Sequence, residues 1–250
     1  MKVRGYEALL FDAVSKGPWV LRPLGGAGIH QIWHVLPTYH RPDAPTLLIA
    51  GGHHGDEQGG SLGILRYIQF INAFQDLPRA NVSFLPILNP RAFNRGVRVV
   101  SKRVNCGFIH GRDELFEDGR ILKYPGSNLR RYSEDGFLTL HECENSKEFY
   151  AYTFGHYPSA CSVRDCGKKL FGVLPNKTPV HDDEGVGFAH NGLVHNLHDG
   201  SLEDWLFHEG ARVSIATEVP IQGTDMEERV HGHTELIDAF ISARIKYHEK

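Results

Sequence analysis

The chain has 250 residues, of which 41% are hydrophobic and 23% charged, and its formal net charge is −3. This composition supplies enough apolar mass for a sizeable core and argues against a disordered chain. The nearly balanced charge argues against a strongly basic nucleic-acid binder. The longest apolar runs have five to seven residues, far short of the ~20 needed to span a bilayer, so we expect no membrane association.

The N-terminal segment does not have the pattern of a signal peptide. Asp12 interrupts its apolar stretch, and no small-residue cleavage site follows. We therefore expect a cytoplasmic protein. The length is typical of one large α/β domain, and we expect a single domain over residues 1–250.

In chain order, short apolar or alternating runs over 7–14, 18–26 and 29–37 predict three strands separated by Gly and Pro. Residues 46–50 are uniformly apolar and predict a buried strand that ends in two glycines. Residues 61–74 have apolar side chains at three-residue steps, which predicts a helix. The run 81–90 predicts another strand, with Pro86 favouring an edge position or a bulge.

The second half of the sequence is less regular. Strands are predicted over 136–142 and 213–220, and an amphipathic helix begins near Thr224, where Thr224 and Glu227 have the spacing of a capping box. The stretches 105–136 and 155–200 show little periodicity and are interpreted as long loops. The alternation of strands and helices favours a layered α/β fold.

Four predicted strands run into chemically useful side chains. His53, His54 and Glu57 follow the strand over 46–50; Asn89-Pro90 follows the next one; His141 and Glu218 end the last two. Ligands bind at the carboxyl ends of strands in open α/β sheets. If these strands are neighbours, imidazoles and carboxylates gather at one edge of the sheet.

That set of side chains predicts a catalytic site for one zinc ion. His54, Glu57 and His141 would supply the three protein ligands, since two histidines and one glutamate form a known ligand set. Glu218 would be the general base. Three alternatives stay open: His53 in place of His54, Cys143 as a soft ligand, and a second metal bound by the acidic segment 181–184.

These motifs resemble, in the same order, those of the M14 metallocarboxypeptidase family over roughly residues 46–220. The matching segments are GGHHGDE (51–57), Asn89-Pro90 followed by Arg98, the stretch 104–108 around Asn105, Leu140-His141-Glu142, and GSLEDWLFHEGARVSIATEVP (200–220). The resemblance implies a three-layer α/β/α fold with a mixed sheet. It also implies that Arg98 polarises the scissile carbonyl and that Asn105 helps to hold the substrate.

The sequence departs from the family pattern at three places. Cys106 stands where the family often has an arginine that binds a C-terminal carboxylate, Arg103 replaces an acidic residue, and the tyrosine expected before Asp204-Trp205 is missing. A thiol cannot replace a bidentate guanidinium. Candidates for the carboxylate contact are Arg95, Arg103, Arg130 and Arg131; candidates near the missing tyrosine are His195, Asn196 and His198.

The sequence therefore predicts a zinc-dependent, carboxypeptidase-like hydrolase that acts on a small peptide or peptide-like amide. It contains neither a phosphate-binding G-x-x-x-x-G-K-[ST] loop nor a G-x-S-x-G nucleophile elbow. Two rival interpretations stay open. One is an N-acyl amino acid deacylase resembling the aspartoacylase and succinylglutamate desuccinylase branch. The other is a metal-binding domain without catalytic activity.

Overall fold

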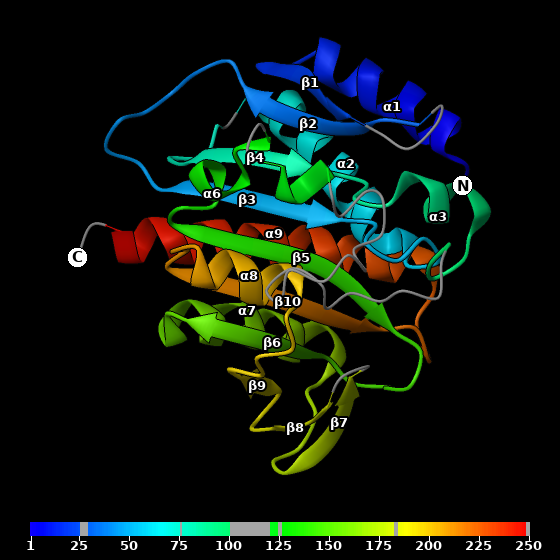
Figure 1. The fold of residues 1–250 in the computed structure, drawn as a ribbon, viewed down its shortest axis with the longest axis vertical. Coiled ribbons are helices and arrows are strands. Elements are labelled where there is room, and N and C mark those ends of the chain that lie inside the picture. Colours follow the sequence, from blue (N-terminus) through cyan, green and yellow to red (C-terminus); the bar gives the residue numbers. More distant parts are fainter. Residues whose placement is uncertain (26–29, 76, 101–120, 125–126, 183–184, 249–250) are drawn as a thin grey trace.

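A mixed β-sheet forms the centre of the part of the chain that the computed structural model describes, which is residues 1–25, 30–75, 77–100, 121–124, 127–182 and 185–248. In Figure 1 the strands of this sheet follow one another down the view, from β1 near the top to β9 near the bottom. Its eight strands have the order β1-β2-β4-β3-β5-β10-β6-β9. Their bounds are β1 Trp19–Gly25, β2 Ile32–Pro37, β3 Thr46–Gly51, β4 Asn81–Leu85, β5 Gly136–Cys143, β6 Tyr150–Gly155, β9 Leu193–His195 and β10 Val213–Pro220.

The four central strands of the sheet are parallel to one another. β3 pairs with β4 and β5, and β5 pairs with β10, all in parallel. Their carboxyl ends therefore lie along the same edge of the sheet, which is where ligands bind in this class of fold. The register places His141 of β5 directly beside Glu218 of β10.

Helices cover both faces of the sheet. Helices α1 (Val3–Ser15), α2 (Gln58–Phe74), α7 (Tyr157–Phe171) and α9 (Met226–His248) lie on one face, and α6 (Leu129–Tyr132) and α8 (Leu202–His208) lie on the other (Figure 1). Strand β3 divides its side chains between the two cores. Leu47 and Ile49 pack under the first group of helices, and Leu48 and Ala50 under the second. The predicted three-layer α/β/α class with a mixed sheet is confirmed.

The prediction of a strand over 7–14 is wrong, because this segment lies in α1. Its buried side chains include Val3, Tyr6, Leu10 and Val14, which recur with the period of a helix. The short window that starts at residue 7 misses the first two. Tyr6 also donates a hydrogen bond from its hydroxyl to the Ser61 carbonyl at 2.7 Å, which joins α1 to α2.

The interpretation of 155–200 as a long loop is also wrong. It contains α7, β9 and a separate hairpin of β7 (Thr178–Asp182) and β8 (Gly185–Ala189). The buried face of α7 is formed mostly by small residues, which include Ser159, Ala160 and Gly167. At Gly167, a Cβ would lie 2.3 Å from the Phe149 ring, so the close packing requires glycine.

Two smaller predictions need correction. Strand β4 lies between β2 and β3 and is not at an edge; it ends at Leu85, before Pro86 would interrupt the ladder of hydrogen bonds. The capping box of α9 is one residue later than predicted. The Asp225 carboxylate accepts from the Glu228 N–H, and the Glu228 carboxylate accepts from the Asp225 N–H, both at 2.8 Å. Within the described ranges, no helix is both long and apolar enough to cross a membrane.

Candidate metal centre

The turn from β3 to α2 carries the first two candidate ligands, His54 and Glu57. Gly52 has φ +61°, a left-handed conformation that glycine adopts without strain. The Gly55 N–H points at the carbonyl oxygens of Val97 and Arg98, at 3.1 and 3.2 Å. A Cβ on Gly55 would lie 2.0 Å from the Ala92 carbonyl carbon, so the turn can approach α3 (Pro90–Arg95) only with glycine here.

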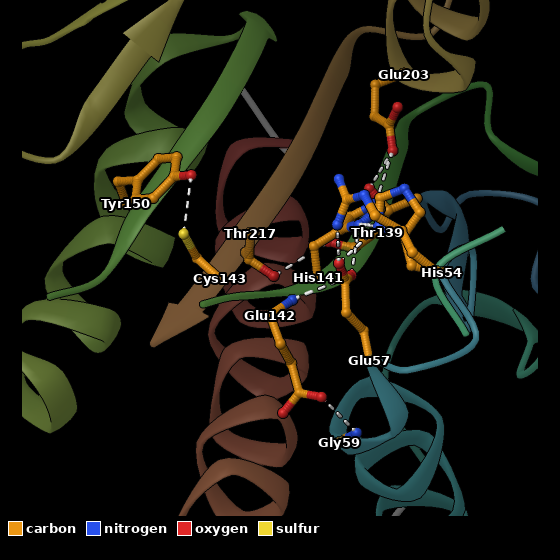
Figure 2. Close-up of polar contacts among 11 residues, drawn as sticks. His54, Glu57, Gly59, Thr139, His141, Glu142, Cys143, Tyr150, Glu203 and Thr217 are labelled. Carbon is orange, nitrogen blue, oxygen red and sulfur yellow. Dashed lines mark hydrogen bonds and ion pairs between the residues drawn. The ribbon is translucent and has the colours of Figure 1, made fainter. Parts of the chain in front are cut away.

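Three buried donors converge at the end of this turn (Figure 2). The Nδ1 atom of His54 lies 2.6 Å from Oε1 of Glu57, and Nδ1 of His141 lies 3.0 Å from Oε2 of the same carboxylate. The two Nδ1 atoms are 3.3 Å apart. All three side chains are less than 10% exposed. The structure thus brings together the three residues that the sequence predicts as ligands.

The spacing of these atoms fits a zinc shell. Bonds of ~2.1 Å in tetrahedral geometry place neighbouring ligand atoms about 3.4 Å apart. The three donor atoms lie within 4.8 Å of one another, and the His54–His141 distance already matches. The two contacts of Glu57, at 2.6 Å to His54 and 3.0 Å to His141, are shorter and must open slightly. Two imidazoles and one carboxylate leave the fourth position for water or substrate, as in catalytic zinc sites.

The electrostatics of the cluster favour an ionised carboxylate beside its histidines. Burial alone would raise the pKa of Glu57, but the charge of His54 and the hydrogen bonds from both histidines hold it well below its ordinary value. For His141, burial would lower the pKa. Hydrogen bonds to Glu203 and Glu57, with the negative charge of Glu218, raise it well above the ordinary value instead. A bound metal ion would need Glu57 ionised and both imidazoles neutral, so its binding would displace the proton that the raised pKa leaves on His141.

Glu203 faces the other nitrogen of His141. Its Oε1 lies 3.7 Å from His141 Nε2 and accepts a hydrogen bond from the Thr139 hydroxyl. Burial would raise the pKa of Glu203, but His141, His53 and Thr139 lower it to about 2. A carboxylate on the far nitrogen of a ligating histidine fixes the ring orientation and increases its basicity.

Glu142 lies next to His141 on β5 but points to the opposite face of the sheet. Its Oε2 accepts from the Gly59 N–H in the first turn of α2 at 3.0 Å (Figure 2), and its Oε1 lies 2.5 Å from Nε of Arg229 on α9. The Glu142 N–H, in turn, donates to Oε2 of Glu57 at 3.2 Å. One residue thereby joins β5, α2 and α9 directly behind the candidate ligands.

Arg98 and Glu218 line the same cavity as the three candidate ligands. This cavity has a volume of about 410 Å³. Arg98 is half-exposed, and its guanidinium donates to Oε1 of Glu57 at 2.8 Å. Glu218 lies beside His141 in the register of β10 and β5. The predicted catalytic residues and the predicted ligands thus share one cavity.

The alternatives left open by the sequence are less well placed. His53 and Cys143 line the cavity, but neither belongs to the three-atom cluster found among the described residues. The Cys143 sulfur accepts from the Tyr150 hydroxyl at 3.5 Å (Figure 2). Arg95, Arg130 and Arg131 are not among the described residues of the cavity wall, and neither are His195, Asn196 and His198. Residues 103, 105, 106, 183 and 184 lie outside the described part of the chain, so the structure does not bear on Asn105 or on the complete acidic segment.

Sequence reasoning missed several residues of this site, namely Glu203, Glu142 as a structural link, Tyr150 and Tyr152. Glu203 had a signal that could have revealed it. It directly follows Leu202 at the start of a short helix, where it is buried together with Leu202, Asp204 and Leu206, and an acidic residue is rarely buried without a partner. The two tyrosines lie in β6, which was not predicted, so no signal pointed to them.

Comparisons with solved structures define the class of fold. A protein from Shewanella denitrificans, provisionally named a metallopeptidase, has a TM-score of 0.85 and 27% identity, with 97% of this chain and 90% of that chain covered. A similarly named protein from Shewanella amazonensis has a TM-score of 0.84 and 26% identity, with 96% and 92% covered. A metallo-carboxypeptidase from Burkholderia cenocepacia has a TM-score of 0.71 and 12% identity, with 97% and 69% covered, a likeness of fold alone. The chain thus has the fold of the metallo-carboxypeptidases.

A match to a sequence-family model points to one branch within this class of fold. Residues 43–146 match the model of the succinylglutamate desuccinylase/aspartoacylase catalytic domain, and this range contains His54, Glu57 and His141. Among curated proteins, none matches the sequence closely enough to count as a relative. The matches confirm the resemblance to the metallo-carboxypeptidases and to the related desuccinylase branch. They support a hydrolase of this superfamily.

Proposed function

We propose that this protein is a zinc-dependent hydrolase that cleaves an amide bond in a small peptide or an N-acyl amino acid. The observation that carries the proposal is the convergence of His54, Glu57 and His141 inside a cavity whose wall also holds Glu218 and Arg98. A zinc ion held by this donor set supplies Lewis acidity, which lowers the pKa of water towards ~7 and polarises a carbonyl group.

The protein's own residues divide the remaining work. Glu218 accepts a proton from the attacking water as oxygen adds to the carbonyl carbon, and it returns that proton to the amine nitrogen when the C–N bond breaks. Arg98 donates hydrogen bonds to the carbonyl oxygen as negative charge develops there. Arg98 now donates to Glu57, and charge neutralisation of Glu57 by a bound cation would free the guanidinium for this role.

Substrate size follows from the cavity. A volume of about 410 Å³ suits a short peptide end or an acylated amino acid and lies within the usual range for small-molecule sites. Tyr150 and Tyr152 from β6 supply aromatic surface on one wall. The match of residues 43–146 to the desuccinylase and aspartoacylase domain favours the deacylase alternative, in which the amide nitrogen belongs to an amino acid.

The test is a paired assay on N-acyl amino acids and on short peptides, with protein stripped by chelator and then reconstituted with zinc. We expect hydrolysis of one of the two classes with zinc and none without it. Glu218→Gln should retain zinc and the melting temperature of the wild type, since glutamine is nearly isosteric. It should lose ~10²–10⁴-fold in turnover, because it cannot accept a proton at neutral pH.

Glu235→Gln, a change of an exposed carboxylate on α9, is the matched control and should leave turnover unchanged. Near-native turnover of Glu218→Gln would remove Glu218 from the mechanism. A zinc-loaded wild-type protein that hydrolyses no substrate in either class would contradict the proposed function and favour a binding domain without catalytic activity.

A further inference from the structure

A second cluster of metal-ligating side chains lies on α8 and the loop before it, outside the site described above. It consists of His198, Asp204 and His208, whose ligand atoms all lie within 4.8 Å of one another. Oδ1 of Asp204 lies 2.7 Å from Nδ1 of His198 and 3.6 Å from Nε2 of His208. Oδ2 of the same carboxylate accepts from the Gly200 N–H at 3.0 Å.

The exposure of these groups differs from that of an ordinary surface ion pair. The Asp204 side chain is 1% exposed, whereas the imidazoles of His198 and His208 are 50% and 55% exposed. A buried carboxylate, oriented by a backbone N–H, therefore presents one oxygen to two imidazoles at the surface. Asp204 and His208 are also i and i+4 on one helix, the spacing at which two side chains share a face.

The separations of donor atoms resemble those of the first cluster. There the nitrogen–oxygen distances are 2.6 and 3.0 Å; here they are 2.7 and 3.6 Å. Zinc bonds of ~2.0–2.1 Å to histidine nitrogen and carboxylate oxygen require separations of this order. The half-exposed imidazoles leave the solvent side open for water ligands.

We propose that His198, Asp204 and His208 bind a second divalent metal ion, of the class that prefers imidazole ligands: zinc, nickel, cobalt or copper. Two nitrogens and one oxygen suit these ions better than calcium or magnesium, which require several oxygen ligands. The proposal does not rest on the function proposed for the first site.

The location gives the ion a structural effect on the cavity. The segment 199–203 lies between His198 and Asp204 and contributes Asp199, Ser201 and Glu203 to the cavity wall. The His198 ring also lies 5.5 Å from the ring of Phe154, another residue of that wall. An ion bound by His198 and by Asp204 and His208 of α8 would link the two ends of this segment and restrict its movement.

The experiment measures zinc stoichiometry by equilibrium dialysis and elemental analysis on the untagged full chain, stripped by chelator. Wild type should bind two equivalents, the second at higher free zinc than the first. His208→Gln and His198→Gln should each bind one. His231→Gln, a change of an exposed histidine on α9, should bind two, and His141→Ala should lose the tighter equivalent while retaining the weaker.

Cobalt(II) provides a second readout, because its visible absorption reports histidine coordination separately at each site. We expect the absorption band of the more weakly bound cobalt ion to vanish in His208→Gln and to persist in His141→Ala. Wild type that binds a single equivalent when the first site is fully saturated would overturn the proposal, and so would a His208→Gln protein that still binds two. Circular dichroism on each variant verifies folding, which these exposed positions should not disturb.

Discussion

The contact between Glu203 and His141 leads to a quantitative prediction for metal affinity. Glu203 is buried, and its Oε1 lies 3.7 Å from Nε2 of His141, the nitrogen that does not face the proposed metal. Replacing it by glutamine keeps the volume and one acceptor oxygen but removes the negative charge. We expect Glu203→Gln to bind zinc at the His54–Glu57–His141 site more weakly than wild type.

The magnitude follows from how such partners act. A carboxylate on the far nitrogen of a ligating histidine is typically worth 10–100-fold in metal affinity, or ~1.4–2.7 kcal/mol. Burial disfavours the ionised form of Glu203, but His141, His53 and Thr139 outweigh it and lower the pKa of Glu203 to about 2, so the folded protein favours the carboxylate. The Thr139 hydroxyl also donates to Glu203 and should hold the glutamine carbonyl in the same place.

The assay is competition for zinc against a chromophoric chelator, for wild type, Glu203→Gln and Glu209→Gln. Glu209 lies just after α8, where it pairs with Arg130 at 3.6 Å, so its change controls for the loss of one negative charge nearby. The melting temperature of the metal-free protein separates loss of affinity from loss of folding. If Glu203→Gln binds zinc as tightly as Glu209→Gln, Glu203 does not orient His141 and the reasoning fails.

Three further predictions concern the ligands, acid stability and specificity. His141→Ala should lose most of the tightly bound metal, because two remaining donors make a poor site. His53→Ala should keep the full equivalent of tightly bound metal, as measured by elemental analysis. The metal-free protein should lose stability as the pH falls below 4.5 towards 2. The ionised Glu203 carboxylate stabilises the folded state in full above its unfolded pKa of 4.5, by an amount on the order of 3 kcal/mol, and this contribution is lost progressively as the pH falls from 4.5 towards the folded pKa of about 2. Denaturant unfolding at pH 6 to 3 should show this slope in wild type and less of it in Glu203→Gln; equal slopes would contradict the assignment. Because Cys106 stands where an arginine is expected, substrates with a free terminal carboxylate and their amides should be cleaved at similar rates. A bidentate arginine contact is worth ~1.5–3 kcal/mol, so a hundredfold preference for the acid would mean that another arginine binds it.

The sequence predicted the four central strands well because each contains a short, mainly apolar run that leads to glycine or to chemically distinctive residues. The bounds of β10 match the predicted 213–220, and the three ligands predicted at strand ends converge as expected. The prediction failed where burial depends on small residues, as at Gly167 in α7. It also failed at α1, because the segment considered began at residue 7 and left out Val3 and Tyr6, which show the helical period.

Residues that act through other residues were the hardest to find. Glu203 and Glu142 contact nothing near them in sequence that would mark them as parts of the site. Their partners come from β5, α2 and α9, so their roles depend on how distant segments meet. A single sequence identifies a side chain by its chemistry, but such a partnership becomes visible only in three dimensions.

The link through Glu142 has a consequence for how the cavity responds to changes far from it. Glu142 joins Arg229 of α9 to the Gly59 N–H of α2, and its own backbone N–H donates to Glu57. The last helix of the described chain is therefore anchored to the strand and the turn that carry the candidate ligands. Damage to that anchor, by loss of the Arg229 guanidinium or displacement of α9, would loosen Glu57 and His141 together. The proposed activity would then be lost through a change on the opposite face of the sheet, with every candidate ligand still present in the sequence.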